Sequence, residues 1–157
     1  MFITTEELSS AIYAYQLEQI TEGNADIPSM AIGAAIEEMK SYLEPNSQTH
    51  YRDGRKRYDI SAVFNAEEEA RNPLILELCK SMAVYYICRL ANVDIIHEQV
   101  KQRYDRAIDW LEKVSATGKY AGQTPISANL PVLESDPESD TSLPFRAGSR
   151  EKFNHEY

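Results

Sequence analysis

The segment NPLILELCKSMAVYYICRLAN, residues 72–92, decides the fold of this chain. Asn72 can cap the start of a helix, and Pro73 suits the first helical position, where its missing N–H costs little. The apolar residues that follow fall on nearly every face, whereas a surface helix confines them to one stripe. We therefore expect the central helix of a bundle here. These apolar residues are Leu74, Ile75, Leu78, Cys79, Met82, Ala83, Tyr86, Ile87 and Leu90.

The N-terminal residues carry a strong helix-start pattern. Thr4 and Glu7 are spaced so that each side chain can bond the other's backbone amide, and Ile3 is spaced to contact Leu8. The chain from Thr4 is therefore predicted to form one helix. Its inward residues would include Leu8, Ile12 and Tyr15, and it would end in the turn at residues 21–24.

A second amphipathic helix is predicted to begin near residues 26–29. Pro28 falls in its first turn, where proline is tolerated, and Pro45 stops it. The polar residues Glu37, Glu38 and Lys40 are expected on the side away from the apolar stripe. That stripe consists of Ile32, Ile36, Met39 and Leu43.

The last predicted helix spans residues 94–118, with Gly118 as its C-terminal stop. Its inward residues would be Ile96, Val100, Tyr104 or Arg103, Ala107, Leu111 and Val114, and its outward residues Lys101, Arg106, Asp109, Glu112 and Lys113. Together the segments predict an all-α fold, a small bundle of four to five helices formed by residues 1–118.

Residues 46–71 break this regularity and are predicted to form a long loop or a short hairpin within the bundle. Tyr58, Ile60 and the pair Val63-Phe64 would hold its return leg against the body, and residues 67–71 would add a helical turn. The loop also contains the cationic run Arg52, Arg55, Lys56 and Arg57. Three interpretations of this run fit: a solvated or ion-paired turn, a contact with an acidic partner, or a contact with DNA.

Residues 119–157 are predicted to form an extended C-terminal arm. Four prolines, at 125, 131, 137 and 144, interrupt any regular helix, and residues 134–140 are acidic with no large apolar residue. Such a segment buries too little apolar surface to fold alone in water. A small helical body with a long arm is suited to contacting neighbouring molecules.

Composition limits the classes of function. The chain of 157 residues suffices for about one domain, and its net charge of −9 opposes a general attraction to nucleic acid phosphates. The N-terminus lacks the pattern of a secretory signal, and no uncharged apolar stretch is long enough to span a bilayer. Cys79 and Cys88 fall on opposite faces of one predicted helix, so they are expected to be buried free thiols. These features predict a protein made in a reducing cytoplasm.

The residue pattern does not favour catalysis. His97-Glu98 begins like a zinc-binding helix motif, but Lys101 occupies the position of the second histidine. His50 and His155 have no partner at ligand spacing. Carboxylate pairs such as Glu37-Glu38 are expected on solvated helix faces. We expect no enzymatic activity, no metal and no cofactor.

The order of several features resembles the small helical head-tail connector proteins of tailed bacteriophages and prophages, most of all the Mu-like group. The matching features are the Thr5-Glu-Glu-Leu8 start, Met39-Lys-Ser-Tyr-Leu43, the Asn72-Pro73 helix start, Gln102-Arg-Tyr-Asp-Arg-Ala-Ile-Asp-Trp-Leu111 followed by Gly118-Lys119, and the ending Gly148-Ser-Arg-Glu-Lys-Phe153 with Tyr157. Residues 46–71 and 134–140 show no match.

This resemblance implies an adaptor that forms a ring, typically of about twelve copies, between the portal of the DNA-filled head and the tail. It places the protein in the virion neck, after synthesis and assembly in the bacterial cytoplasm. The partners would be other copies of the chain, the portal protein, a tail or neck protein and, in the channel, packaged DNA. In the arm, Phe145, Phe153 and Tyr157 would be apolar anchors, with Arg146, Arg150 and Lys152 pairing at the rim.

Two other classes of function fit the same residues. A DNA-associated accessory protein would use the basic loop at residues 52–57 and bind with an affinity that falls steeply with salt. A small regulatory binding protein would fold its arm onto one host or phage partner at one-to-one stoichiometry and form no ring.

Overall fold

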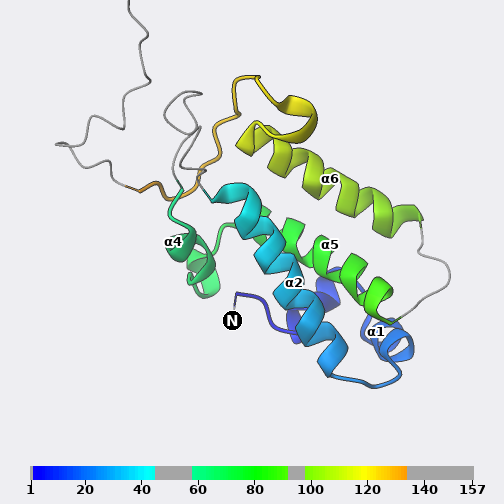
Figure 1. Cartoon of the computed structure of the whole chain (residues 1–157). Helices are drawn as coiled ribbons and strands as arrows, with labels where there is room; N and C mark the ends of the chain where they lie inside the picture. Colours follow the sequence, from blue (N-terminus) through cyan, green and yellow to red (C-terminus); the bar gives the residue numbers. More distant parts are fainter. Residues whose placement is uncertain (1, 45–57, 92–97, 134–157) are drawn as a thin grey trace, which may run out of the picture.

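A computed structural model describes residues 2–44, 58–91 and 98–133 of the chain (Figure 1). The described elements are 3-10 helix η1 (Glu6–Ser10), α1 (Ala14–Thr21), α2 (Asp26–Leu43), α4 (Ile60–Phe64), 3-10 helix η2 (Glu68–Ala70), α5 (Pro73–Leu90), α6 (Glu98–Ser115) and 3-10 helix η3 (Gly118–Tyr120). The described residues contain no strand, only an isolated bridge between Tyr58 and Val132. The predicted all-α bundle is confirmed.

Helix α5 lies at the centre, with α2 along one side and α6 along another (Figure 1). It begins as predicted, because the Asn72 side chain accepts hydrogen bonds from the backbone amides of Leu74 and Ile75 at 3.0 and 3.2 Å. Its two ends are less buried than the pattern indicated, since Leu74 and Leu90 are exposed.

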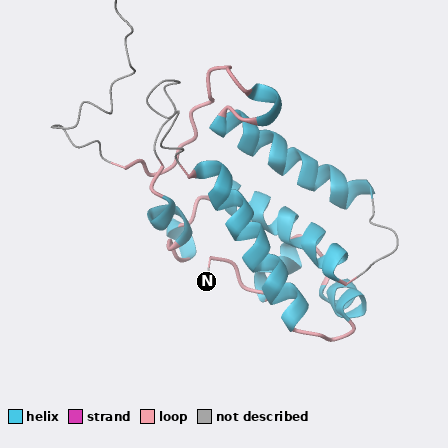
Figure 2. Ribbon diagram, in the orientation of Figure 1, coloured by secondary structure: helices cyan, strands magenta, loops and turns pink. Residues whose placement is uncertain are grey.

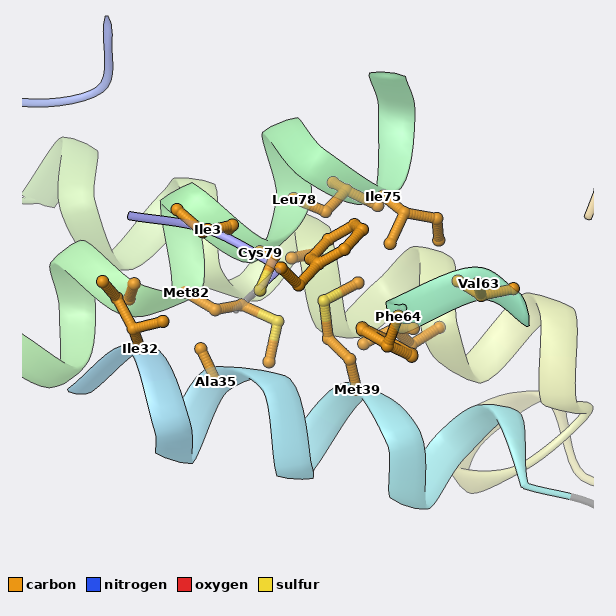
Figure 3. Close-up of a cluster of buried hydrophobic side chains, with 14 of the residues drawn as sticks. Ile3, Ile32, Ala35, Met39, Val63, Phe64, Ile75, Leu78, Cys79 and Met82 are labelled. Atoms are coloured by element: carbon orange, nitrogen blue, oxygen red, sulfur yellow. The ribbon is translucent and has the colours of Figure 1, made fainter. Parts of the chain in front are cut away.

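The core forms where α5 faces α2 (Figure 3). Met82 and Cys79 of α5 are fully buried, and so are Ala35 and Met39 of α2. Side chains of α4 close one end of this layer, and α6 adds residues on the other side of α5. The α6 contribution consists of Ala107, Leu111 and Val114. Burial of this apolar layer supplies the main free energy that holds the helices together.

The N-terminal start pattern is confirmed, but the single helix predicted after it is wrong. The Thr4 amide donates to the Glu7 carboxylate at 2.9 Å, and Ile3 and Leu8 are fully buried. Helix η1 then ends at Ser10, because Tyr13 adopts an extended backbone conformation (φ −65°, ψ 140°) and α1 starts afresh behind it. The break changes the helical register, so Tyr15 points outward and is 61% exposed.

The end of α6 also differs from the prediction. Ala116, rather than Gly118, takes the left-handed conformation (φ 49°) that stops the helix, and the Thr117 amide donates back to the Glu112 carbonyl at 3.0 Å. Gly118 follows with φ 54° and opens η3. This left-handed backbone conformation strains any residue with a Cβ atom, which explains the glycine there.

An ionic cluster fastens the η3 turn to α6. The Asp109 carboxylate pairs with Lys113 at 2.6 Å and with Lys119, and it accepts a hydrogen bond from the Tyr120 hydroxyl at 2.8 Å. These donors hold the pKa of Asp109 well below its ordinary value. Asp109 and Lys113, which were predicted to point outward into solvent, are therefore only half-exposed and hold the turn in place.

The chain before α5 packs against the body as predicted. Tyr58, Val63 and Phe64 are buried, and η2 supplies the extra turn expected at residues 67–71. Arg71 then binds the N-terminal segment, because its guanidinium pairs with the Glu7 carboxylate at 2.6 Å and donates to the Phe2 carbonyl at 2.8 Å. The structure of the loop that precedes Tyr58 lies outside the described residues.

After η3 the chain returns along the bundle as a loop toward α4 (Figure 2). Leu130 is buried, the Asp59 amide donates to the Pro131 carbonyl at 2.9 Å, and the Asn72 side chain donates to the Asn129 carbonyl at 3.1 Å. Residues 119–133 thus lie against the body. The predicted boundary between body and arm at residue 118 stays a prediction.

Candidate interaction surface

The residues predicted to bind partners lie outside the described part of the chain. This applies to the six arm residues Phe145, Arg146, Arg150, Lys152, Phe153 and Tyr157, and to the four loop residues Arg52, Arg55, Lys56 and Arg57. The roles of these arm and loop residues stay predictions. His50, His97 and His155, for which no ligand role was predicted, also lie outside the described residues.

A groove runs between the N-terminal elements, η1 and α1, and the pair formed by α5 and α6. Its wider part has a volume of about 680 Å³. Val84 and Cys88 of α5 form its floor, Ile12 lines the N-terminal side, and Val100 lines the α6 side. A narrower part of about 260 Å³ continues it along α5, and the two parts share Ser10, Ala11 and Arg103.

Basic side chains line the narrower part of this groove. They are Lys80 of α5 and Arg103 and Arg106 of α6, opposed by one carboxylate, that of Glu77. Lys80 donates to the Ser10 hydroxyl at 3.2 Å. None of the three cations forms an ion pair with another described residue. A chain with a net charge of −9 therefore presents a locally cationic groove.

Two tyrosines stand beside the wider part of the groove. Tyr13 lines it and is 69% exposed, and its ring stacks on that of Tyr15 with the centroids 5.8 Å apart. Tyrosine is enriched at protein interfaces because it combines a large apolar ring with a hydroxyl that can stay hydrated. The groove thus combines apolar, aromatic and cationic groups, which suits a protein partner.

Comparison with known protein families identifies the family of the chain. A model of the family described as "Bacteriophage Mu, Gp36" matches residues 2–128. The chain belongs to this family. No curated protein and no solved structure gives a significant match.

Membership of the Gp36 family makes the chain a bacteriophage-type protein and confirms the Mu-like resemblance. The matched residues include every described helix and the whole groove, and residues 129–157 lie beyond the match. The family match therefore covers the helical body but not the acidic segment 134–140 or the arm ending 145–157.

Sequence reasoning missed one polar cluster of this Gp36-family chain. Glu38, predicted to be solvated, lies half-buried between three helices and accepts hydrogen bonds from the Tyr86 hydroxyl at 2.8 Å and the Tyr104 hydroxyl at 2.9 Å. Tyr85 stacks on Tyr104 with ring centroids 4.1 Å apart. Burial is the largest cause that raises the pKa of Tyr104, and the hydrogen bond to Glu38 is the second, so this hydroxyl stays protonated. Glu38 lies one turn after the buried Ala35, a spacing that could have indicated its position.

The described residues of the Gp36-family chain bear on the sequence predictions for metal ligands and thiols. No cluster of three or more His, Cys, Asp or Glu side chains among them could hold a metal ion. Burial raises the pKa of the Cys79 thiol to about 12, which keeps it protonated and a poor nucleophile. Cys79 and Cys88 are both buried and free, as predicted. No helix in the described ranges is long and apolar enough to cross a membrane.

Proposed function

We propose that this Gp36-family protein is a structural virion protein, a head-tail connector that forms a ring between the portal and the tail in the virion neck. The observation that carries the proposal is the family match across residues 2–128, because it assigns the helical body to a phage family. The connector role itself comes from the resemblance, which implies a ring of about twelve copies.

The described geometry supports this role because one copy carries two unlike features in different places, the site around Leu133 and the wider groove. Leu133 lies next to the bridge between Tyr58 and Val132, near the start of α5. The wider groove is lined by Val84 and Cys88 in the second half of α5 and by residues of α1. Figure 1 shows α1 beside that end of α5. Two unlike surfaces permit a head-to-tail contact, and such contacts generate rings when the rotation closes.

The arm supplies the contacts to the other neck components in this proposal. Phe145, Phe153 and Tyr157 enter pockets of the portal or of a tail or neck protein, and the nearby Arg146, Arg150 and Lys152 pair with carboxylates at the rim. Fixing such a segment costs conformational entropy, so the arm residues bind only where several anchors engage together.

Deleting the gene in the phage that encodes the chain tests the proposal. The expected result is that DNA-filled heads and complete tails accumulate separately, and that added purified protein joins them and restores infectivity. A chain with Phe145→Ser, Phe153→Ser and Tyr157→Ser should fail to join them, whereas Phe145→Leu with Phe153→Leu should keep partial activity. Heads that carry tails normally without the protein would contradict the connector role.

A further inference from the structure

The cationic groove needs an occupant of defined chemistry. Lys80, Arg103 and Arg106 face it, and among the described residues no salt bridge neutralises them. An arginine pairs best with a carboxylate, which accepts two of its N–H donors in a matching geometry. The expected occupant is therefore an acidic segment narrow enough to lie between η1 and the two long helices.

The chain itself contains such a segment. Residues 134–140 read Glu-Ser-Asp-Pro-Glu-Ser-Asp, so a carboxylate occurs at every second position: 134, 136, 138 and 140. In an extended backbone, alternate side chains point to the same side. An extended conformation would therefore present all four carboxylates along one edge, with only small serine and proline side chains on the other.

The ring proposed above favours a second copy as the source of the segment. The segment follows directly on Leu133, which lies by Tyr58 near the start of α5, and the cationic part of the groove is lined by residues of the first half of α5 and of the first half of α6. The return loop contacts α6 near its end, where the Ile126 amide donates to the Lys113 carbonyl at 3.2 Å. Binding within one copy would leave copies without a mutual contact, but binding between copies repeats the same head-to-tail contact around a ring.

We propose that the groove between η1 and the α5–α6 pair binds the acidic segment 134–140 of a neighbouring copy of the chain. This inference rests on the proposed connector function and adds the contact that joins one subunit to the next. Arg103 and Arg106 pair with carboxylates of that segment, Lys80 adds a third cation, and the apolar part of the groove takes side chains near Leu133, which is 41% exposed. The contact offsets the repulsion between copies of a strongly acidic protein.

A charge-swap experiment on the full-length protein tests this contact. One variant, groove-reversed, carries Arg103→Glu and Arg106→Glu, and the other, segment-reversed, carries Asp136→Lys and Glu138→Lys. Self-association is measured by sedimentation velocity over a concentration series, at about 50 mM and about 500 mM salt. Circular dichroism verifies that each variant keeps the helical content of the wild type.

The wild type should associate with itself, and association should weaken at high salt. Each variant alone should lose association by on the order of tenfold or more in affinity. An equal mixture of the two variants should recover association. The reversed groove of one variant then binds the reversed segment of the other, and the native groove of the second binds the native segment of the first. As a matched control, Lys101→Glu should associate like the wild type and Arg103→Glu should not, although both changes alter the net charge equally.

Several results would overturn the inference. One is a wild type that stays monomeric at all concentrations, and another is a groove-reversed variant that associates normally. A third is a mixture that fails to recover association, which is the result expected if the segment binds the groove of its own copy. Loss of duplex DNA binding in the groove-reversed variant, without self-association of the wild type, would instead assign the groove to DNA. If the groove-reversed variant forms normal rings on portals, this contact is wrong but the connector function still holds. If the wild type forms no rings on portals, the connector function itself is wrong.

Discussion

The Glu38 carboxylate of α2 accepts a hydrogen bond from the Tyr104 hydroxyl of α6 at 2.9 Å, across the seam between the two helices. The other carboxylate oxygen accepts from Tyr86 of α5 at 2.8 Å, so one side chain ties together the three long helices. Helix packing by apolar side chains is tolerant of small sliding motions, whereas these directional bonds select one register.

Removing this carboxylate should destabilise the bundle. In Glu38→Ala two half-buried tyrosine hydroxyls lose their acceptor, and we expect the free energy of unfolding to fall by about 1 to 3 kcal/mol in urea denaturation. The neighbouring Glu37→Ala is the matched control, because Glu37 is 72% exposed and its pair with Lys40 is worth little. Equal effects of the two substitutions would show that Glu38 does not hold the helices together.

A second prediction concerns the core at the centre of α5. Met82 is fully buried, so Met82→Ala leaves a cavity and should cost about 2 to 5 kcal/mol of unfolding free energy. Met30 of α2 is 62% exposed, and Met30→Ala should change stability by less than about 0.5 kcal/mol. Thermal and urea unfolding measure both variants. An unchanged melting temperature for Met82→Ala would contradict the placement of α5 at the centre.

Two truncations separate the body from the arm. Ending the chain after Leu133 should keep the melting temperature, because no described contact is lost. Ending it after Gly118 removes the buried Leu130 and uncovers Tyr58, so the protein should keep helical circular dichroism but lose about 2 kcal/mol or more of stability. If both truncated chains melt at the temperature of the full-length protein, the return loop does not belong to the folded body.

The pair of Glu7 and Arg71 predicts a pH dependence of stability. The pKa of Glu7 is lowered from 4.5 to about 2, mainly by the hydrogen bond from the Arg71 guanidinium and secondly by that from the Thr4 amide. A lowered pKa means that the folded state favours the charged form, so this contribution is complete above pH 4.5 and is lost as pH falls toward 2.

Comparing Glu7→Gln with the wild type in urea denaturation isolates this contribution. The wild type should be more stable by about 1 to 2 kcal/mol at pH 7, a value reduced for solvent screening, and the difference should shrink between pH 4.5 and 2. Glu6→Gln, at an exposed position, should show no such trend. A difference that is constant with pH would mean that Glu7 acts through packing and not through its charge.

The sequence predicted the helices whose signals are local. Asn72-Pro73 marked the start of α5, Thr4 and Glu7 marked the N-terminal cap, and the stripe of α2 matched its buried side. Such features depend on hydrogen bonds and spacing within a few residues, which a linear pattern contains.

The features that the sequence did not predict depend on contacts between distant residues. The break at Tyr13 and the early stop at Ala116 had no local signal, because tyrosine and alanine are both tolerated inside helices. The role of Glu38 requires tyrosines 48 and 66 residues away. The groove likewise combines residues of η1, α1, α5 and α6, so it became visible only once the helices were placed together.

The most direct test of the connector proposal is the mass and shape of the complex that the full-length protein forms with portal-containing particles. Native mass spectrometry gives the number of copies, and negative-stain imaging gives their arrangement. The proposal predicts a closed ring of many copies bound beneath the portal. A protein that stays monomeric and never binds the portal under any condition would contradict it and would favour a regulatory binding protein.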